Sequence, residues 1–156
     1  MIGHNKGHVN HTMVLTKSSE YRLLNDAVHH EAMLERLHYN RKLFNRIYIP
    51  EFTWSREKNV IKLEMEYIWG RQLNRIDLKY HQGLSKIIYE DIVLGNEEYG
   101  FKDLAIPNFI IREDDTLAFV DLETYGPYPI DQRRSKFLLR ICDFPEDYLP
   151  EYVRAF

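Results

Sequence analysis

The sequence predicts an α+β fold in which strands and helices occupy separate stretches of the chain. Three patterns support this prediction. Residues 61–67 alternate apolar and charged side chains, as a half-buried strand does. Apolar residues recur on one face of residues 20–38, which indicates a long helix. Two short apolar runs, 109–111 and 117–120, flank the acidic turn 112–115 and predict a β-hairpin.

The first expected strand is the apolar stretch 13–15, which leads to Lys17. Ser18 and Ser19 suit the N-cap of a helix, so the long helix is expected from about Glu20 to His38. Its apolar face is formed by Leu23, Ala27, Leu34 and Leu37.

A further strand is expected over residues 47–54, where β-branched and aromatic side chains surround Pro50. Residues 55–59 are expected to form a turn that leads into the alternating strand 61–67. Gly70 follows and is expected to end this strand.

The second half of the chain is expected to be mostly helical around the hairpin. One helix is predicted over 81–94, where Gly95 stops it, and another over 131–141. Residues 125–129, rich in Tyr, Gly and Pro, predict a rigid loop. The last helix carries a basic cluster that suggests a solvated face or a contact for an anionic substrate: Arg133, Arg134 and Lys136.

The composition limits the class of protein. The 156 residues are 44% hydrophobic and include 11 Tyr and 8 Phe, so a folded domain with a real core is expected. A net charge of −3 argues against a broad nucleic-acid-binding surface. The one cysteine, Cys142, permits no intrachain disulfide and is expected to be a packed small side chain. We expect a cytoplasmic protein without a membrane span, because no long apolar run or signal-peptide pattern occurs.

Three polar residues stand in a spacing that predicts a metal and nucleotide site. Asp103 precedes Asn108 by five residues, and Asp121 follows Asn108 after the hairpin. The hairpin can hold Asn108 and Asp121 side by side, with Asp103 on the loop that leads in. Carboxylate and amide oxygens are ligands that suit Mg²⁺ bound to a nucleotide.

These residues also carry a resemblance to a known family. Residues 101–108, F-K-D-L-A-I-P-N, resemble the catalytic loop H-R-D-L-x-x-x-N of protein kinases, and residues 121–123, D-L-E, resemble the D-F-G that follows it. The chain looks most similar to atypical branches of the protein-kinase-like fold, the small-molecule phosphotransferases and lipopolysaccharide-type kinases.

The resemblance implies a role for each residue of these motifs. Asp103 is expected to act as the catalytic base or to orient the acceptor hydroxyl. Asn108 and Asp121 are expected to hold Mg²⁺, while Glu123 is expected to be a third ligand or to orient Asp121.

Two further segments resemble the nucleotide-binding parts of kinases. Val14 to Lys17 resembles the strand V-A-I-K, whose lysine binds the α- and β-phosphates of ATP and pairs with a helix glutamate. Glu31 is the expected partner of Lys17, and Glu35 is the alternative. Glu66 and Tyr67 lie in a stretch that resembles the hinge, where backbone groups bind adenine.

The N-terminal glycines offer a further weak resemblance to kinases, whereas several positions of the loop differ from the kinase pattern. Gly3 and Gly7 faintly resemble the glycine-rich loop over the ATP phosphates, with a mobile tail as the alternative. Ala105 stands where a kinase loop often has a cation, and Lys102 replaces that cation only if its side chain turns inward. Phe101, at the position of the loop histidine, is expected to serve packing.

The resemblance thus predicts a single, reduced two-lobed kinase-like domain. Its β-rich N-lobe with one long helix spans residues 1–68, and its mostly helical, truncated C-lobe spans residues 69–156. The expected function is ATP- and Mg²⁺-dependent phosphoryl transfer to a hydroxyl of a small molecule or protein. The alternative is a pseudokinase that binds a partner protein without catalysis. A third possibility is an unrelated α+β interaction protein.

Overall fold

The chain folds as an α+β protein, as the sequence predicted, and its computed structural model describes residues 3–9, 12–143 and 150–154. Two compact units form. The first unit comprises Met1–Arg41 and Ile49–Ile68, and the second comprises Lys42–Tyr48 and Trp69–Phe156. The chain therefore passes between the units after residues 41, 48 and 68.

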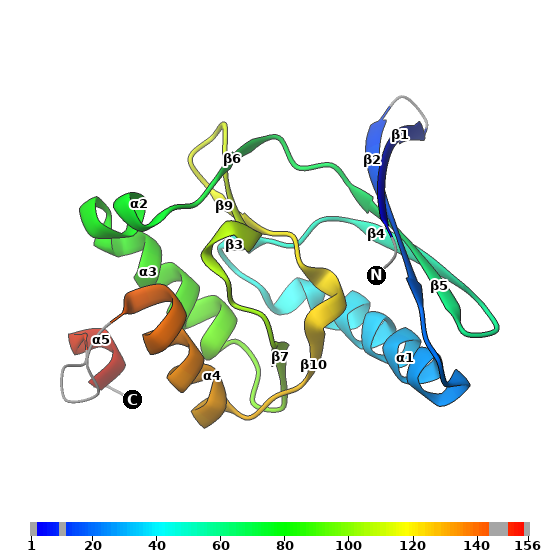
Figure 1. The fold of residues 1–156 in the computed structure, drawn as a ribbon. Helices are drawn as coiled ribbons and strands as arrows, with labels where there is room; N and C mark the ends of the chain where they lie inside the picture. Colours follow the sequence, from blue (N-terminus) through cyan, green and yellow to red (C-terminus); the bar gives the residue numbers. More distant parts are fainter. Residues whose placement is uncertain (1–2, 10–11, 144–149, 155–156) are drawn as a thin grey trace. The chain divides into compact units, whose positions relative to one another are not determined.

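The first unit is a four-stranded antiparallel sheet with one long helix. The strand order is β1-β2-β5-β4. Figure 1 shows helix α1 (Leu24–Asn40) along one side of this sheet. The strands are β1 (Gly3–Val9), β2 (Thr12–Glu20), β5 (Val60–Glu66) and β4 (Phe52–Glu57).

Strand β5 confirms the alternation that the sequence predicted. Ile61, Leu63 and Met65 are buried, while the residues between them are exposed or half-buried. The buried side chains face α1, which contributes Ala27, His30, Leu34 and Leu37 to the core. Burial of apolar surface against the helix holds this unit together, because each buried side chain of this size contributes about 1.5–3 kcal/mol.

The predicted boundary between the first strand and the helix was wrong. β2 continues through Ser18, Ser19 and Glu20, which pair with residues of β5, so the two serines are strand residues and do not cap a helix. Helix α1 begins at Leu24, without a side-chain cap. Pairing with the central strand of the sheet outweighed the local capping preference, because Ser19 lies on the buried face.

The glycine-containing N-terminal segment is a strand. Gly3 and Gly7 lie in β1 and pair with Ser18 and Val14 of β2. The alternative of a mobile tail is therefore wrong for residues 3–9. The predicted turn 55–59 is also shorter than expected, because β4 continues to Glu57 and only residues 58–59 form the turn, with Lys58 at a φ of 56°.

The predicted strand around Pro50 consists of two strands in different units. β3 (Ile47–Tyr48) lies in the second unit, where it runs parallel to β9 (Leu117–Phe119). β4 begins at Phe52 in the first unit. Proline lacks the N–H group that a continuous ladder needs, which is consistent with a break at this position.

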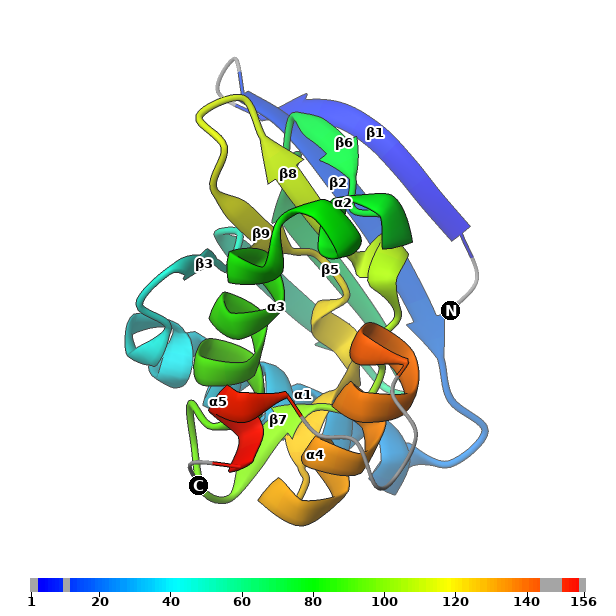
Figure 2. The same ribbon diagram turned by 90° about the vertical axis from the view of Figure 1, so that its left-hand side faces the viewer.

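The second unit contains the predicted β-hairpin, which is confirmed. β8 (Phe109–Arg112) pairs antiparallel with β9, and the sheet order is β3-β9-β8-β6. β6 (Gly70–Gln72) was not predicted. Gly70 has a φ of 152°, and a Cβ at this position would collide with the carbonyl oxygen of Ile111, so glycine is required there. In Figure 2, β6, β8 and β9 lie side by side.

The second unit also contains a two-stranded sheet. β7 (Tyr99–Phe101) pairs antiparallel with β10 (Tyr125–Pro127). The sequence predicted a rigid loop at 125–129, so the strand β10 corrects this expectation for its first three residues. Tyr125 and Tyr128 are buried, and their packing explains why the segment is ordered.

The two predicted helices of the second half are confirmed. The first comprises α3 (Gln82–Ile88) and a π-helical turn, Tyr89–Val93. The second comprises α4 (Ile130–Phe137) and another π-helical turn, Leu138–Cys142. The short helices α2 (Arg75–Tyr80) and α5 (Glu151–Arg154) were not predicted. No helix among the described residues is long and apolar enough to cross a membrane.

The start of α2 has a signal that sequence reasoning missed. The side chain of Asn74 accepts a hydrogen bond from the backbone of Asp77, and the carboxylate of Asp77 accepts one from the backbone of Asn74. This reciprocal pair is a capping box, and its polar residues stand three positions apart in the sequence.

Arg133 corrects the prediction of a solvated basic face on α4. Its side chain is fully buried and donates to the carbonyl oxygens of Val93 at 2.6 Å, Tyr128 at 2.8 Å and Glu97 at 3.2 Å, and also to that of Asn96. Burial lowers the pKa of the guanidinium. Arg133 therefore joins three segments of the second unit and is not available to a substrate.

Cys142 is a half-buried free thiol, as expected from the sequence. Its Sγ lies 3.7 Å from the hydroxyl of Tyr152, which donates a hydrogen bond to Ser85 at 2.9 Å. Burial raises the pKa of Cys142 to about 11, so the thiol is protonated at neutral pH. These contacts connect α3, α5 and the end of the α4 helix.

Candidate functional site

The hairpin brings Asn108 and Asp121 together at its open end. Phe109 pairs with Phe119, so the residues just outside this pair face each other. The backbone N–H of Val120 donates to the carbonyl oxygen of Asn108 at 3.0 Å. The Asn108 Nδ2 atom donates to Asp121 Oδ2 at 3.0 Å. The proximity that the sequence predicted for these two side chains is therefore present.

Asp103 lies on a tight loop that closes on Asn108. Asp103 Oδ1 accepts a hydrogen bond from the backbone N–H of Ala105 at 3.2 Å. The backbone N–H of Asn108 donates to the carbonyl of Ala105 at 3.0 Å, and Asn108 Nδ2 lies 3.5 Å from the carbonyl oxygen of Asp103. Leu104 is buried and anchors the loop. The loop thus presents Asp103, half-buried, beside the Asn108–Asp121 pair.

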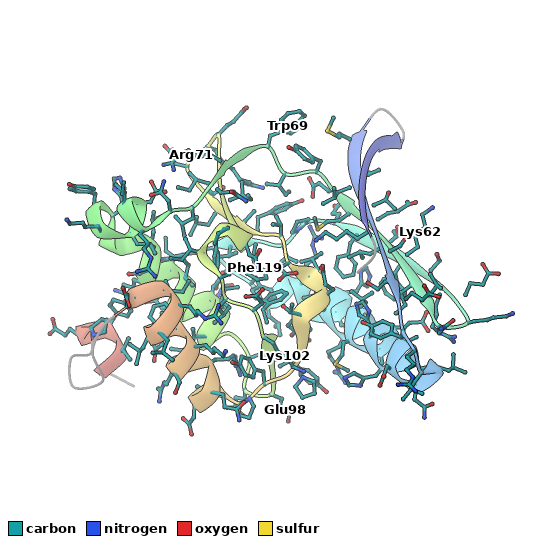
Figure 3. All side chains as sticks on the ribbon, viewed as in Figure 1. Lys62, Trp69, Arg71, Glu98, Lys102 and Phe119 are labelled. Carbon is teal, nitrogen blue, oxygen red and sulfur yellow. The ribbon has the colours of Figure 1, made fainter. Side chains whose placement is uncertain are left out.

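A cluster of packed aromatic rings adjoins the loop that carries Asp103. Phe101 is 1% exposed, and its ring centroid lies 4.3 Å from that of Phe119 and 5.0 Å from that of Tyr125. Phe119 also packs against Phe109 at 4.9 Å. Figure 3 shows Phe119 in the interior of the second unit. Phe101 thus serves packing, as the sequence suggested.

The chain after Asp121 turns at once and returns to the segment that precedes Asp103. The hydroxyl of Thr124 donates to the carbonyl of Asp121 at 3.2 Å, and the N–H of Lys102 donates to the carbonyl of Thr124 at 3.2 Å. Leu122 is fully buried and Glu123 is half-buried. Lys102, labelled in Figure 3, is an exposed residue.

The side chains of this arrangement include oxygen atoms of the kind that can coordinate a cation. Since Nδ2 of Asn108 is bound to Asp121, Oδ1 of the same amide is the atom suited to coordinate a metal, together with a carboxylate oxygen of Asp121. Within the part of the chain that the structure describes, no three His, Cys, Asp or Glu side chains form a metal-binding group. A metal at this place would therefore depend on the amide of Asn108, with the remaining ligands supplied by phosphates and water.

The first unit holds Lys17 and Glu31, the residues expected to orient phosphates. Lys17 lies on β2, pairs with Leu63 and is 7% exposed. Glu31 lies on α1, and its Oε1 atom accepts a hydrogen bond from Nε of Arg56 at 2.9 Å. The expected pairing of Lys17 with Glu31 remains a prediction. Glu35, the alternative partner, is exposed.

The expected hinge residues use their N–H groups inside the first unit. The N–H of Glu66 donates to the carbonyl of Glu51 at 2.9 Å, and that of Tyr67 donates to the carbonyl of Met13 at 3.0 Å. The side chain of Glu66 accepts from the N–H of Glu51. An adenine bound at this strand would therefore need other backbone groups, such as the carbonyl oxygens or the groups of the residues that follow.

Sequence reasoning missed Asp91, a buried carboxylate of the second unit. It is 5% exposed and accepts hydrogen bonds from three successive backbone N–H groups, those of Asn45 at 3.1 Å, Arg46 at 2.7 Å and Ile47 at 2.7 Å. This anchors the segment that continues into β3, which pairs with β9. The signal was an acidic residue inside the apolar run 87–94, where a charge needs a dedicated partner.

No family model matches this chain, and no curated protein matches it in sequence. The resemblance to protein kinases therefore rests on the motifs of the chain itself.

Proposed function

We propose that this protein is a minimal kinase-like phosphotransferase that binds ATP with Mg²⁺ and transfers the γ-phosphoryl group to a hydroxyl. The observation that carries this proposal is the 3.0 Å contact between Asn108 and Asp121 at the mouth of the hairpin, with Asp103 on the adjoining loop. The same three residue types bind Mg²⁺ and orient the nucleophile in kinases.

Each residue has a defined task in the proposed reaction. Asn108 and Asp121 would hold Mg²⁺, which would supply the charge neutralisation that the phosphates need. Oδ1 of Asp103 is bound to the loop backbone, which leaves the other carboxylate oxygen to accept the proton of the acceptor hydroxyl. The hydroxyl oxygen then bonds to the γ-phosphorus while the bond to the β–γ bridging oxygen breaks, and ADP leaves.

Lys17 and Glu31 complete the proposal as the phosphate-orienting pair of the first unit. Lys17 is buried on an inner strand of the sheet, and a strand lysine of this kind binds the α- and β-phosphates in kinases. Glu123 is proposed to support Asp121 or to bind the ion directly. The acceptor hydroxyl belongs to a small molecule or a protein.

A thermal-shift measurement with ATP and Mg²⁺ tests the nucleotide site. Ligand at a hundred times its Kd should stabilise the protein by about 2.7 kcal/mol. Asp121→Ala should remove this stabilisation, and omission of Mg²⁺ should do the same. The matched control is Asp131→Ala, since Asp131 is an almost fully exposed aspartate on α4, outside the site. Equal stabilisation of wild type and Asp121→Ala would contradict the proposal.

A turnover measurement separates an enzyme from a binding protein. Asp103→Asn should retain nucleotide binding and lower the rate of ADP formation by at least about a hundredfold, because the base is lost while the metal ligands remain. An acceptor screen with labelled ATP then identifies the hydroxyl compound that raises the rate.

The alternative function is a pseudokinase that binds a partner protein. The observation in its favour is Ala105, which places no cation in the loop, together with the exposed side chain of Lys102. Nucleotide binding without turnover in any acceptor would support this alternative. The absence of any nucleotide effect on the wild type would exclude the phosphotransferase and leave only a partner-binding role that needs no nucleotide.

A further inference from the structure

We propose that Thr124 is a positioning residue, whose hydroxyl fixes the turn after Asp121 so that the carboxylate of Asp121 stays on the side-chain amide of Asn108. The consequence for Mg²⁺ rests on the proposed function, because Asn108 and Asp121 are the residues that we propose to hold the ion. The placement of Asp121 requires no nucleotide, so the two parts are tested by separate measurements.

The backbone changes direction at Asp121, shortly after the hairpin. Asp121 has a φ of −96° and a ψ of 72°, between the values of an extended strand and those of a helix, and the 3₁₀ turn Leu122–Thr124 follows it at once. The rotamers open to a side chain depend on its φ and ψ angles. The contacts that fix this turn therefore also direct the carboxylate of Asp121.

The side chain of Thr124 closes the turn on Asp121. Oγ1 of Thr124 donates a hydrogen bond to the backbone carbonyl of Asp121 at 3.2 Å. The backbone N–H of Tyr125 donates to the carbonyl of Leu122 and closes the same turn one residue later. A β-branched side chain has few χ1 rotamers, so the hydroxyl of Thr124 loses little freedom when it makes this bond.

Thr124 is itself anchored in the second unit. Its carbonyl oxygen accepts a hydrogen bond from the backbone N–H of Lys102 at 3.2 Å. The next residue, Tyr125, is buried and pairs with Phe101 in the β10–β7 sheet. Leu122, at the other end of the turn, is fully buried. Thr124 therefore lies between two buried side chains and gives its hydroxyl a fixed position from which to bind Asp121.

The hairpin holds Asp121 from the other side. The backbone N–H of Val120 donates to the carbonyl of Asn108 at 3.0 Å, which fixes the residue just before Asp121. Nδ2 of Asn108 donates to Oδ2 of Asp121 at 3.0 Å. Asp121 is thus held by the hairpin before it and by Thr124 after it, and its carboxylate meets the amide where these two constraints agree.

Thr124 contacts the two halves of the candidate site through different atoms. Its hydroxyl contacts Asp121, whereas its backbone carbonyl contacts Lys102, the neighbour of Asp103. A variant without the hydroxyl keeps the carbonyl, so it should disturb the proposed metal ligands and leave the loop of Asp103 in place. The expected signature is weaker binding of Mg²⁺ together with an unchanged kcat at saturating Mg²⁺.

The first measurement observes the placement of Asp121 directly, without nucleotide. The side-chain amide protons of Asn108 are recorded by nuclear magnetic resonance in the wild type, Thr124→Val and Thr124→Ser. Valine keeps the branched shape and removes the hydroxyl, so the hydrogen-bonded amide proton of Asn108 should move toward the shift of an amide in water. Serine keeps the hydroxyl and should return the signal toward that of the wild type. Unchanged Asn108 signals in Thr124→Val would overturn the inference.

The second measurement determines how the reaction with ATP depends on Mg²⁺. Thr124→Val should raise the Mg²⁺ concentration for half-maximal rate by about three- to tenfold, as expected for the loss of one hydrogen bond. Thr124→Ser should restore most of the Mg²⁺ affinity. The matched control is Thr116→Val, because the exposed Thr116 also makes side-chain hydrogen bonds, to Arg112 and Asp114, at the far end of the hairpin. This control should leave the Mg²⁺ dependence unchanged.

Two further outcomes would contradict the positioning role. Equal increases in the Mg²⁺ requirement for Thr124→Val and Thr116→Val would show a general effect of lost stability. A lower kcat with an unchanged Mg²⁺ requirement would show that Thr124 acts on the loop of Asp103 and not on Asp121. If Thr124→Val does not fold, Thr124→Ala takes its place. A wild type that does not bind MgATP would remove the proposed function, whereas the signals of Asn108 would still decide the placement of Asp121.

Discussion

Two groups of polar side chains in the second unit differ in what they bind. Asp91 and Arg133 are almost completely buried, and their hydrogen bonds go to backbone N–H and carbonyl groups. Asn108 and Asp121 are half-exposed and bind each other through their side chains. The first group fixes distant segments of the chain, whereas the second group joins the two ends of one hairpin.

This difference separates charged residues that hold the architecture from those that we propose to bind a ligand. A buried charge whose hydrogen bonds are all made by the backbone has no capacity left for a substrate, and its removal leaves several backbone groups without partners. A half-exposed pair has little influence on folding because water can replace its contacts. Under the proposed function, removal of the first group should lower stability, whereas removal of the second should lower ligand binding and leave stability almost unchanged.

The largest effect on stability is expected for Arg133→Met. The change leaves the carbonyls of Val93, Asn96 and Tyr128 without their buried donor, so the free energy of unfolding should fall by about 3–5 kcal/mol. Urea unfolding measures this. The neighbouring Arg134→Met is the control, since Arg134 is partly exposed and donates a single hydrogen bond, to Tyr89. A loss below about 1 kcal/mol for Arg133→Met would break the comparison.

A smaller decrease in the free energy of unfolding is expected for Asp91→Asn. The amide has one acceptor oxygen instead of two and would place its NH₂ group against a backbone N–H, so the loss should be about 2–3 kcal/mol. Hydrogen exchange should accelerate at the amides of residues 45–47 before it does elsewhere. Glu90→Gln, at the adjacent half-exposed carboxylate, should change both readouts little. Uniform acceleration over the whole chain would show that Asp91 has no local anchoring role.

Asp121→Asn tests the half-exposed pair, for which the change in stability is expected to be small. Asn can still accept the hydrogen bond from Asn108, so the free energy of unfolding without ligand should change by less than about 1 kcal/mol. Stabilisation by ATP with Mg²⁺ should nevertheless be lost, because the charged ligand is gone. A large loss of stability without any ligand would place Asp121 in the architectural group.

The sequence predicted the parts of the fold where one pattern dominates. The alternation in β5 and the two apolar runs of the β8–β9 hairpin left one reasonable interpretation, and both are confirmed. The predicted proximity of Asn108 and Asp121 followed from that hairpin. Burial of one face sets the period of such strands, so the pattern is readable without the tertiary structure.

The predictions from sequence were wrong where contacts between residues far apart in the chain determine the local structure. Ser18 and Ser19 have the residue types of a helix cap, but β5 extends the strand through them. Arg133 follows an ordinary surface pattern on α4, and its burial depends on carbonyls of residues 93–97, far away in the sequence. Arg56 likewise gave no sign of its contact with Glu31, because the two residues meet only when α1 packs on the sheet.

Asp77 combines features of the buried and the half-exposed groups. Loss of its ion pair is expected to change the free energy of unfolding least. Its carboxylate is mostly buried like that of Asp91, but it binds an exposed side chain, accepting two hydrogen bonds from the guanidinium of Arg71 at 2.7 and 2.8 Å and one from the backbone of Asn74 at 3.0 Å. The hydrogen bonds from Arg71 hold the pKa of Asp77 below its ordinary value of 3.8, while burial opposes this shift.

The sign of the pH dependence follows from the lowered pKa. Asp77 stabilises the fold as a carboxylate, so its contribution is fully present above its unfolded pKa of 3.8 and is lost as the pH falls below that value toward the pKa of the folded state. Arg71→Gln should therefore reduce the acid dependence of stability, and the gap between wild type and variant should narrow from about pH 6 to about pH 3 in urea unfolding. Arg75→Gln is the control, because its partner Asp143 is exposed. A gap that stays constant over this range would mean that Arg71 contributes by packing and not by stabilising the charged form of Asp77.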